Sequence, residues 1–163
     1  MKGFSSGLFE KLLGDGARSS SQSLVRLLSL EELKDEVARD LESLLNTRAV
    51  FTLDNLKKYP ECSTSIINYG LHDFAGMSLA STDDRATICR NLEQSIARHE
   101  PRLRSVRASL EVQDGKINRL SFSISALLVV STTQEPVSFD AVLQPSSLQY
   151  SIKKSRYTAR IGI

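Results

Sequence analysis

The sequence has no tryptophan, two cysteines, two histidines and four prolines among its 163 residues. Cys62 and Cys89 are too few and too far apart for a disulfide framework or a zinc knuckle, so reduced thiols and a cytoplasmic location are expected. His72 and His99 belong to no metal-binding motif. The sequence therefore predicts no metal site, no cofactor and no disulfide-rich secreted fold.

Long apolar runs are also lacking. The longest is "ALLVV" at 126–130, which is far too short to cross a bilayer, and the first 16 residues lack the apolar core of a secretory signal. The 21 basic and 19 acidic side chains leave a formal charge of +2. This net charge is too small to attract nucleic acid or an anionic membrane strongly, so neither is expected as a main partner.

The length suits one domain with a single core, flanked by short tails. Residues 1–28 hold a small apolar cluster followed by the Gly/Ser-rich "GDGARSSSQS", which indicates a docking peptide on a flexible linker. An alternative is equally open: the cluster packs on the domain's own core. Residues 29–152 form the expected domain, and 153–163 a basic C-terminal tail.

Two amphipathic helices are expected. The first covers 29–48, where leucines recur at helical spacing and Ser29 with Glu32 has the pattern of a capping box. A long ordered loop with short helical turns follows from 51 to 80. The second helix begins near Thr82, buries one apolar stripe and ends before Pro101, which cannot continue a helix.

After the second helix the apolar period changes from 3.6 to 2. The alternation predicts strands over 106–112, 120–130, 137–143 and 148–152, with a hairpin turn at Asp114 and Gly115. Helices first and a meander afterwards give an α+β domain: two main amphipathic helices packed on a small antiparallel β-meander of about four strands.

The residue pattern offers little catalytic chemistry. No glycine-rich phosphate motif is present, and a Cys62–His72 dyad lacks a third orienting group. Pairing Glu100 with a distant aspartate as a glycosidase pair has no specific support. The four arginines of "RHEPRLRSVR" at 98–107 leave nucleic-acid binding a minor option, because no aromatic residues lie among them. A non-enzymatic protein is expected.

Four fragments carry a resemblance to a known family. "LLNTR" ends the first helix, "IINYGL" lies in the long loop, "EPRL" closes the second helix and "EPVSFD" opens the third strand. In this order and spacing they resemble TssE, the baseplate subunit of the bacterial type VI secretion system, from about residue 8 to 152. TssE is similar to the wedge protein of contractile phage tails, which belongs to a family sometimes labelled lysozyme-like.

The resemblance implies a structural subunit that works on the cytoplasmic side of the inner-membrane complex. It joins the TssF and TssG core of each wedge, near TssK, to the TssB/TssC sheath, and helps to initiate sheath assembly. An edge strand, expected at 120–130 or 148–152, accepts strands from the sheath. The implied partner-binding residues are Glu100, Pro101, Arg102, Asn46, Arg48, Asn68, Tyr69, Leu8, Phe9 and Leu12.

Alternatives remain at this stage. Glu100 and Arg102 could pair with each other inside the domain instead of with a partner. A related family with the same turn acts as an anti-adaptor that protects a sigma factor from proteolysis, and the lysozyme-like label suggests a peptidoglycan hydrolase.

Overall fold

The computed structural model describes residues 4–5, 27–51, 53–74, 76–112, 120–130, 133–144, 146–147 and 149–155. The expected docking residues Leu8, Phe9 and Leu12 and the expected turn at 114–115 lie outside them. No helix in these ranges is long and apolar enough to span a membrane.

The elements, in chain order, are β1 (Phe4–Ser5), β2 (Leu27–Leu28), α2 (Leu30–Asn46), α3 (Leu53–Lys57), the 3-10 turns η1 (Pro60–Thr64) and η2 (Ile66–Asn68), α4 (Thr82–His99), β3 (Leu103–Val112), β4 (Leu120–Val130), β5 (Thr133–Gln144) and β6 (Gln149–Lys154).

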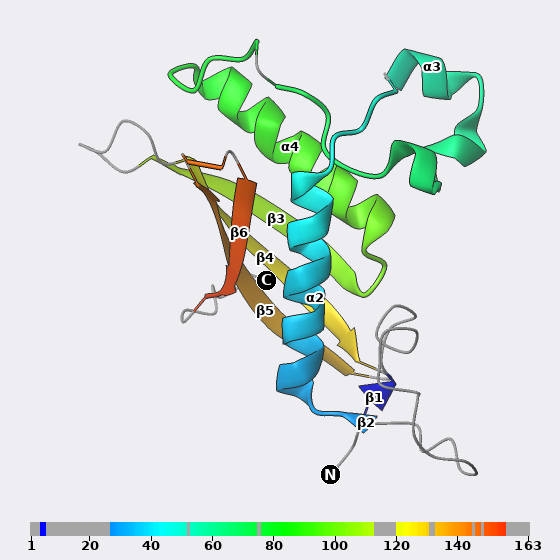
Figure 1. The fold of residues 1–163 in the computed structure, drawn as a ribbon, viewed down its shortest axis with the longest axis vertical. Coiled ribbons are helices and arrows are strands. Elements are labelled where there is room, and N and C mark those ends of the chain that lie inside the picture. Colours follow the sequence, from blue (N-terminus) through cyan, green and yellow to red (C-terminus); the bar gives the residue numbers. More distant parts are fainter. Residues whose placement is uncertain are drawn as a thin grey trace.

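The main sheet confirms the predicted α+β class. Strands β3, β4, β5 and β6 lie side by side in sequence order, each antiparallel to the next, and two long helices pack against them (Figure 1). β4 pairs with β3 on one side and β5 on the other, so the expectation that 120–130 is an edge strand is wrong. β6 is an edge strand, as the other half of that prediction has it.

The third strand is longer than its apolar alternation suggests. β5 starts at Thr133, four residues before the predicted start at Val137, and includes Pro136. β6 continues through Lys154, two residues into the segment expected to be a tail. The apolar pattern failed to mark these ends because polar side chains occupy them, while backbone pairing alone extends the ladders.

The start of α2 forms as predicted. The Ser29 hydroxyl accepts the Glu32 amide proton, and the Glu32 carboxylate accepts from the Ser29 amide at 2.8 Å. These reciprocal bonds satisfy amide donors that have no partner within the helix. Ser81 caps α4 by accepting from the Asp84 amide, and α4 ends at His99, just before Pro101.

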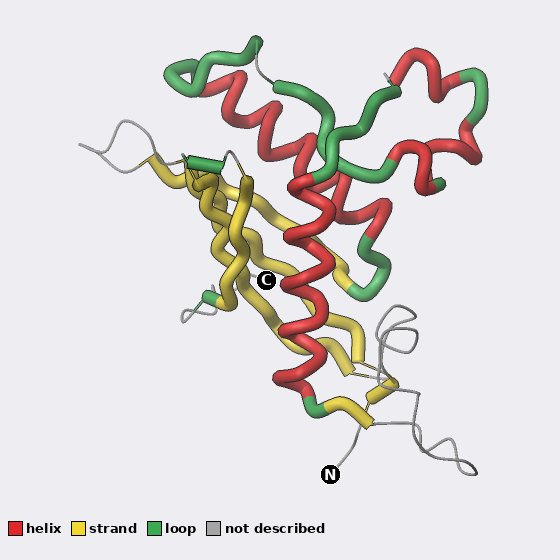
Figure 2. The backbone as a smooth tube through the Cα atoms, in the orientation of Figure 1, coloured by secondary structure: helices red, strands yellow, loops and turns green. Residues whose placement is uncertain are grey.

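One core lies between the helices and the sheet. β4 alternates regularly, with its even-numbered residues from Phe122 to Val130 buried and its odd-numbered residues half-buried. Both helices therefore cover the same face of the sheet, and Figure 2 shows them together on that side. The buried apolar residues of these two helices are Leu33, Val37, Leu41, Leu44 and Leu45 from α2 and Ile88, Leu92 and Ile96 from α4.

Candidate functional site

Three of the four family-like fragments meet at one place, which we call the motif corner: residues 46–49, 68–71 and 99–102. The segment after α2 runs beside the loop before α4. The Leu71 amide donates to the Thr47 carbonyl and the Ala49 amide donates to the Leu71 carbonyl, both at 2.9 Å. Gly70 makes this approach possible, because its φ is +122° and a Cβ there would lie 2.4 Å from the Thr47 carbonyl oxygen.

Helix α4 holds the loop from the other side. The Ser95 hydroxyl donates to the Gly70 carbonyl at 3.0 Å, and His99 Nε2 lies 3.1 Å from the Asn68 carbonyl oxygen. The His99 ring also meets the Tyr69 ring edge-on, with centroids 5.4 Å apart. Burial lowers the pKa of His99, although the Asn68 carbonyl favours the protonated ring. The His99 ring is therefore neutral near pH 7, and in this form it holds the loop in place.

The Glu100–Pro101–Arg102 turn is built around an internal ion pair. Arg102 donates from Nε to Glu100 Oε1 at 2.7 Å and from Nη2 to Glu100 Oε2 at 2.6 Å. Arg102 also pairs with Asp40 and, at 3.6 Å, with Glu36, both from α2. Burial opposes the charge on Arg102, but its carboxylate partners raise its pKa overall. One guanidinium thus joins α2 to the end of α4.

The Asn46 side chain is hydrogen-bonded to the backbone of the edge strand β6. Its side-chain amide donates to the Tyr150 carbonyl at 2.9 Å and accepts from the Tyr150 amide at 2.7 Å. One turn earlier, the Glu42 carboxylate accepts from the Ile152 amide at 2.8 Å. Side chains of α2 therefore occupy the outer edge of β6, where a further strand would otherwise pair.

The opposite edge of the sheet is covered in the same manner. Glu93 of α4 accepts from the Ala108 amide at 2.8 Å, and Cys89 takes a backbone hydrogen bond from Leu110. The outer edges of β3 and β6 thus both carry helix side chains.

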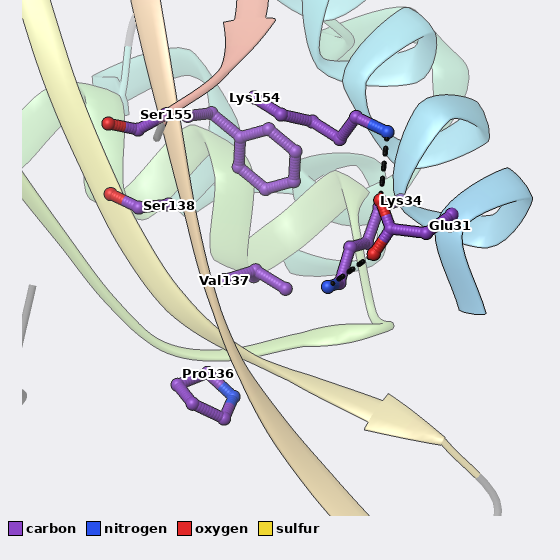
Figure 3. Close-up of a pocket in the computed structure, with 8 residues that line it drawn as sticks. Glu31, Lys34, Pro136, Val137, Ser138, Lys154 and Ser155 are labelled. Atoms are coloured by element: carbon purple, nitrogen blue, oxygen red, sulfur yellow. Dashed lines mark hydrogen bonds and ion pairs between the residues drawn. The ribbon is translucent and has the colours of Figure 1, made fainter. Parts of the chain in front are cut away.

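One stretch of edge differs. The Ser138 carbonyl accepts from the Ser155 amide, and alternate strand residues point to the same edge, so Gln134 and Pro136 face the same side as Ser138. β4 pairs with both residues on the other side, but no described strand pairs with them on this outer side of β5. Pro136 has no amide proton to leave unpaired there, which suits an edge position. Beside this stretch lies a hollow of about 370 Å³, shown in Figure 3 with the ion pairs of Glu31 to Lys34 and Lys154.

The structure thus brings seven of the ten proposed partner-binding residues close to one another. Glu100 and Asn68 are buried, whereas Pro101 and Arg48 are exposed, and Arg48 forms a surface pair with Asp73 at 3.0 Å. The internal pairing of Glu100 with Arg102, the alternative weighed from the sequence, is present. The seven are Asn46, Arg48, Asn68, Tyr69, Glu100, Pro101 and Arg102, and the Tyr69 ring meets that of His99.

Sequence reasoning missed Glu36 and Asp40. Two acids four residues apart on one helix repel each other unless a cation lies between them, so their spacing beside the buried Val37 was the available signal. Among the residues described, no group of three or more His, Cys, Asp or Glu side chains is arranged to hold a metal ion.

A family model described as baseplate wedge protein gp25 matches residues 31–133, which is more than half of the chain. The curated proteins contain no match. The matched range includes all of α2 except its first residue, the whole motif corner, α4, β3 and β4. Proteins of this family have a structural role in a baseplate, as the resemblance of the four fragments to TssE implies. The chain therefore belongs to the baseplate wedge protein gp25 family.

Proposed function

We propose that this chain is the wedge subunit of a type VI secretion baseplate, where it joins the TssF/TssG core, near TssK, to the TssB/TssC sheath and helps to start sheath assembly. Two features support this role. The motif corner offers a rigid surface for the core, and among the described residues the outer side of β5 at Gln134 and Pro136 has no paired strand and is free for the sheath. Family membership gives the structural class of the protein.

The outer side of β5 at Gln134 and Pro136, where no described strand pairs, is the observation that carries the sheath contact. The other outer positions on β3 and β6 described above are occupied by Glu93, Asn46 and Glu42. At Gln134 and Pro136 the backbone faces outward without a described strand beside it. A strand added here would run antiparallel to β5 and be held mainly by main-chain hydrogen bonds. Occupation of the remaining edges would direct the incoming strand to this place.

The core contact uses the outside of the motif corner. Asn46, Arg48 and Pro101 are exposed, while the buried Glu100 and Asn68 fix the chain that carries them. A surface preorganised in this way loses little conformational entropy when a partner binds. The Glu100–Arg102 pair and its contacts to α2 would therefore support the wedge contact through geometry.

A substitution at Gln134 tests the sheath contact. Gln134→Pro removes the outward-facing amide proton and leaves the β4 side of β5 intact, so it should block strand addition without unfolding the domain. We expect sheath assembly on purified wedges to fall at least tenfold while binding to TssF and TssG is unchanged. Gln134→Thr, which keeps the amide, is the matched control. Normal sheath assembly by the proline variant would rule out this edge.

A further inference from the structure

The described part of β6 pairs with only part of its neighbour β5. β5 begins at Thr133, but the described pairing with β6 ends at Phe139, followed by one hydrogen bond from the Ser155 amide to the Ser138 carbonyl at 2.8 Å. The sequence continues beyond Ser155 to residue 163. Because paired strands advance at the same rate, residues 156–160 would lie opposite residues 133–137 if the ladder went on.

The end of β6 is held beside this part of β5. Lys154 forms ion pairs with Glu31 at 3.1 Å and with Asp35 at 2.7 Å, so two carboxylates of α2 fix its position. Lys154 and Ser155 also line the hollow next to β5, together with Pro136 (Figure 3). The chain that follows Ser155 therefore begins at the stretch of β5 that no described strand covers on its outer side.

The register of the described ladder decides which main-chain groups would meet. Continued from its last pairs, it places Tyr157 opposite Pro136 and Ala159 opposite Gln134, the two outward-facing positions of β5. Tyr157 would donate to the Pro136 carbonyl, and Ala159 would exchange two hydrogen bonds with Gln134. The proline removes one donor from this edge and leaves its carbonyl free to accept.

The apolar side chains of the added strand would lie on one face. In this register Tyr157 and Ala159 are on the side of the sheet away from the helices. On that side, β4 places the half-buried Leu127 next to Pro136 and the half-buried Val129 next to Gln134. Residues 157 and 159 would therefore extend an apolar surface that β4 and β5 already form.

The basic side chains would lie on the other face. Thr158 would be directly opposite Glu135, with Arg156 and Arg160 diagonal to the same carboxylate and within reach of it. Opposite charges at these positions favour the pairing. A slip of one residue would exchange the two faces and place both arginines on the apolar side, so the side chains and the main chain agree on one register.

We propose that residues 156–160, here called the tail strand, extend β6 along β5 in the free subunit and occupy the edge that a sheath strand would take. The contact itself is argued from the register of β5 and β6, and its consequence for the sheath rests on the proposed function. The outward-facing groups of Gln134 and Pro136 pair with one strand at a time, so the sheath strand must displace the tail strand. Because the tail strand is joined directly to β6, its effective concentration is high and the free subunit binds the sheath weakly.

NMR of the full chain tests the contact. Thr158 and Glu135 would form a pair without mutual hydrogen bonds, so their Hα atoms should give a cross-strand nuclear Overhauser effect. The Gln134 amide should exchange its proton slowly. Ala159→Pro removes the amide that faces β5 and should speed exchange at Gln134 at least about tenfold. Thr158→Pro is the matched control, because the amide at 158 faces away from β5 and its loss should leave that exchange slow.

Binding to purified TssB/TssC sheath subunits tests the competition with the same three proteins. Ala159→Pro should bind at least about fivefold more tightly than the unaltered chain, because the edge no longer has to be cleared first. Thr158→Pro should bind like the unaltered chain. Equal binding by all three proteins, with the NMR contact present in the unaltered chain, would show that the tail strand does not compete with the sheath.

The remaining outcomes separate the contact from the proposed function. Fast exchange at Gln134 in the unaltered chain would overturn the contact, whatever the sheath does. Slow exchange without the Thr158–Glu135 signal would assign the edge to another segment, and a signal seen only between differently labelled copies would assign it to a second chain. If the NMR contact is present but neither the unaltered chain nor Ala159→Pro binds TssB/TssC, the proposed sheath role falls and the tail-strand contact stands.

Discussion

Glu100 and Arg102, two residues apart, form a bidentate pair in which Nε and Nη2 of the guanidinium lie 2.7 and 2.6 Å from the two carboxylate oxygens. Pro101 between them stays exposed. The Glu100 side chain is only 7% exposed and that of Arg102 26% exposed, so the pair lies mostly out of water. The Glu100–Pro101–Arg102 turn therefore holds an internal ion pair and also presents Pro101 at the surface.

Replacing Arg102 tests the strength of this connection. Arg102→Gln leaves three carboxylates, Glu36, Asp40 and Glu100, without their cation. Loss of one member of a buried pair costs about 3 kcal/mol in the free energy of unfolding. Urea denaturation at pH 7 measures this loss of stability.

Arg48→Gln serves as the control for that experiment. Its partner Asp73 is 64% exposed and Arg48 itself 77%, so the loss should stay under about 0.5 kcal/mol. Similar small losses in both variants would mean that water screens the Arg102 cluster as it screens the surface pair.

Asn46 joins α2 to the edge strand β6 through two hydrogen bonds to Tyr150. Asn46→Ala removes both, and each is worth about 0.5–1.5 kcal/mol, so stability should fall by about 1–2 kcal/mol. The Tyr150 amide should also exchange its proton faster, which NMR detects directly. Ser43→Ala, on the exposed side of the same helix, should affect neither quantity. An unchanged exchange rate at Tyr150 would show that Asn46 does not hold the edge.

Helices and strands with a repeating apolar pattern could be predicted from the sequence. Strand ends and contacts that depend on residues far away in the sequence could not. The apolar stripe of α4 and the alternation of β4 identify both elements, because each buried position is repeated along the sequence. The early start of β5 at Thr133 could not be predicted, since its first residues are polar and gain their structure from pairing with β4.

The motif corner shows the same limit in another form. The resemblance selected Asn46, Asn68 and Glu100, and the structure brings their segments together. Nothing in the sequence states that the Asn46 amide meets the Tyr150 backbone, 104 residues away. Chain topology decides which polar groups meet, so the choice between an internal contact and a partner contact had to wait for the structure.

Gly70 should tolerate no side chain. In Gly70→Ala the methyl group would collide with the Thr47 carbonyl oxygen, and φ of +122° is strained for alanine, so stability should fall by at least about 2 kcal/mol. Gly76→Ala is the matched control, because its Cβ would meet no atom within 4 Å. Stability there should be unchanged or rise by up to about 1 kcal/mol. Equal effects in thermal denaturation would contradict the close approach at Gly70.

Stability should fall on mild acidification because of the two histidines. Burial lowers the pKa of both His99 and His72 below the ordinary value of 6.5. The unfolded chain then binds more protons than the folded one below about pH 6.5, so the free energy of unfolding decreases as pH falls from 7.5 to 5.5. His99→Gln should flatten this dependence, and His72→Gln should flatten it separately. Urea denaturation at the two pH values measures the slope, while NMR titration gives each imidazole midpoint directly. A His99 midpoint above 6.5, or stability that rises on acidification, would show that the contact with the Asn68 carbonyl outweighs burial at this ring.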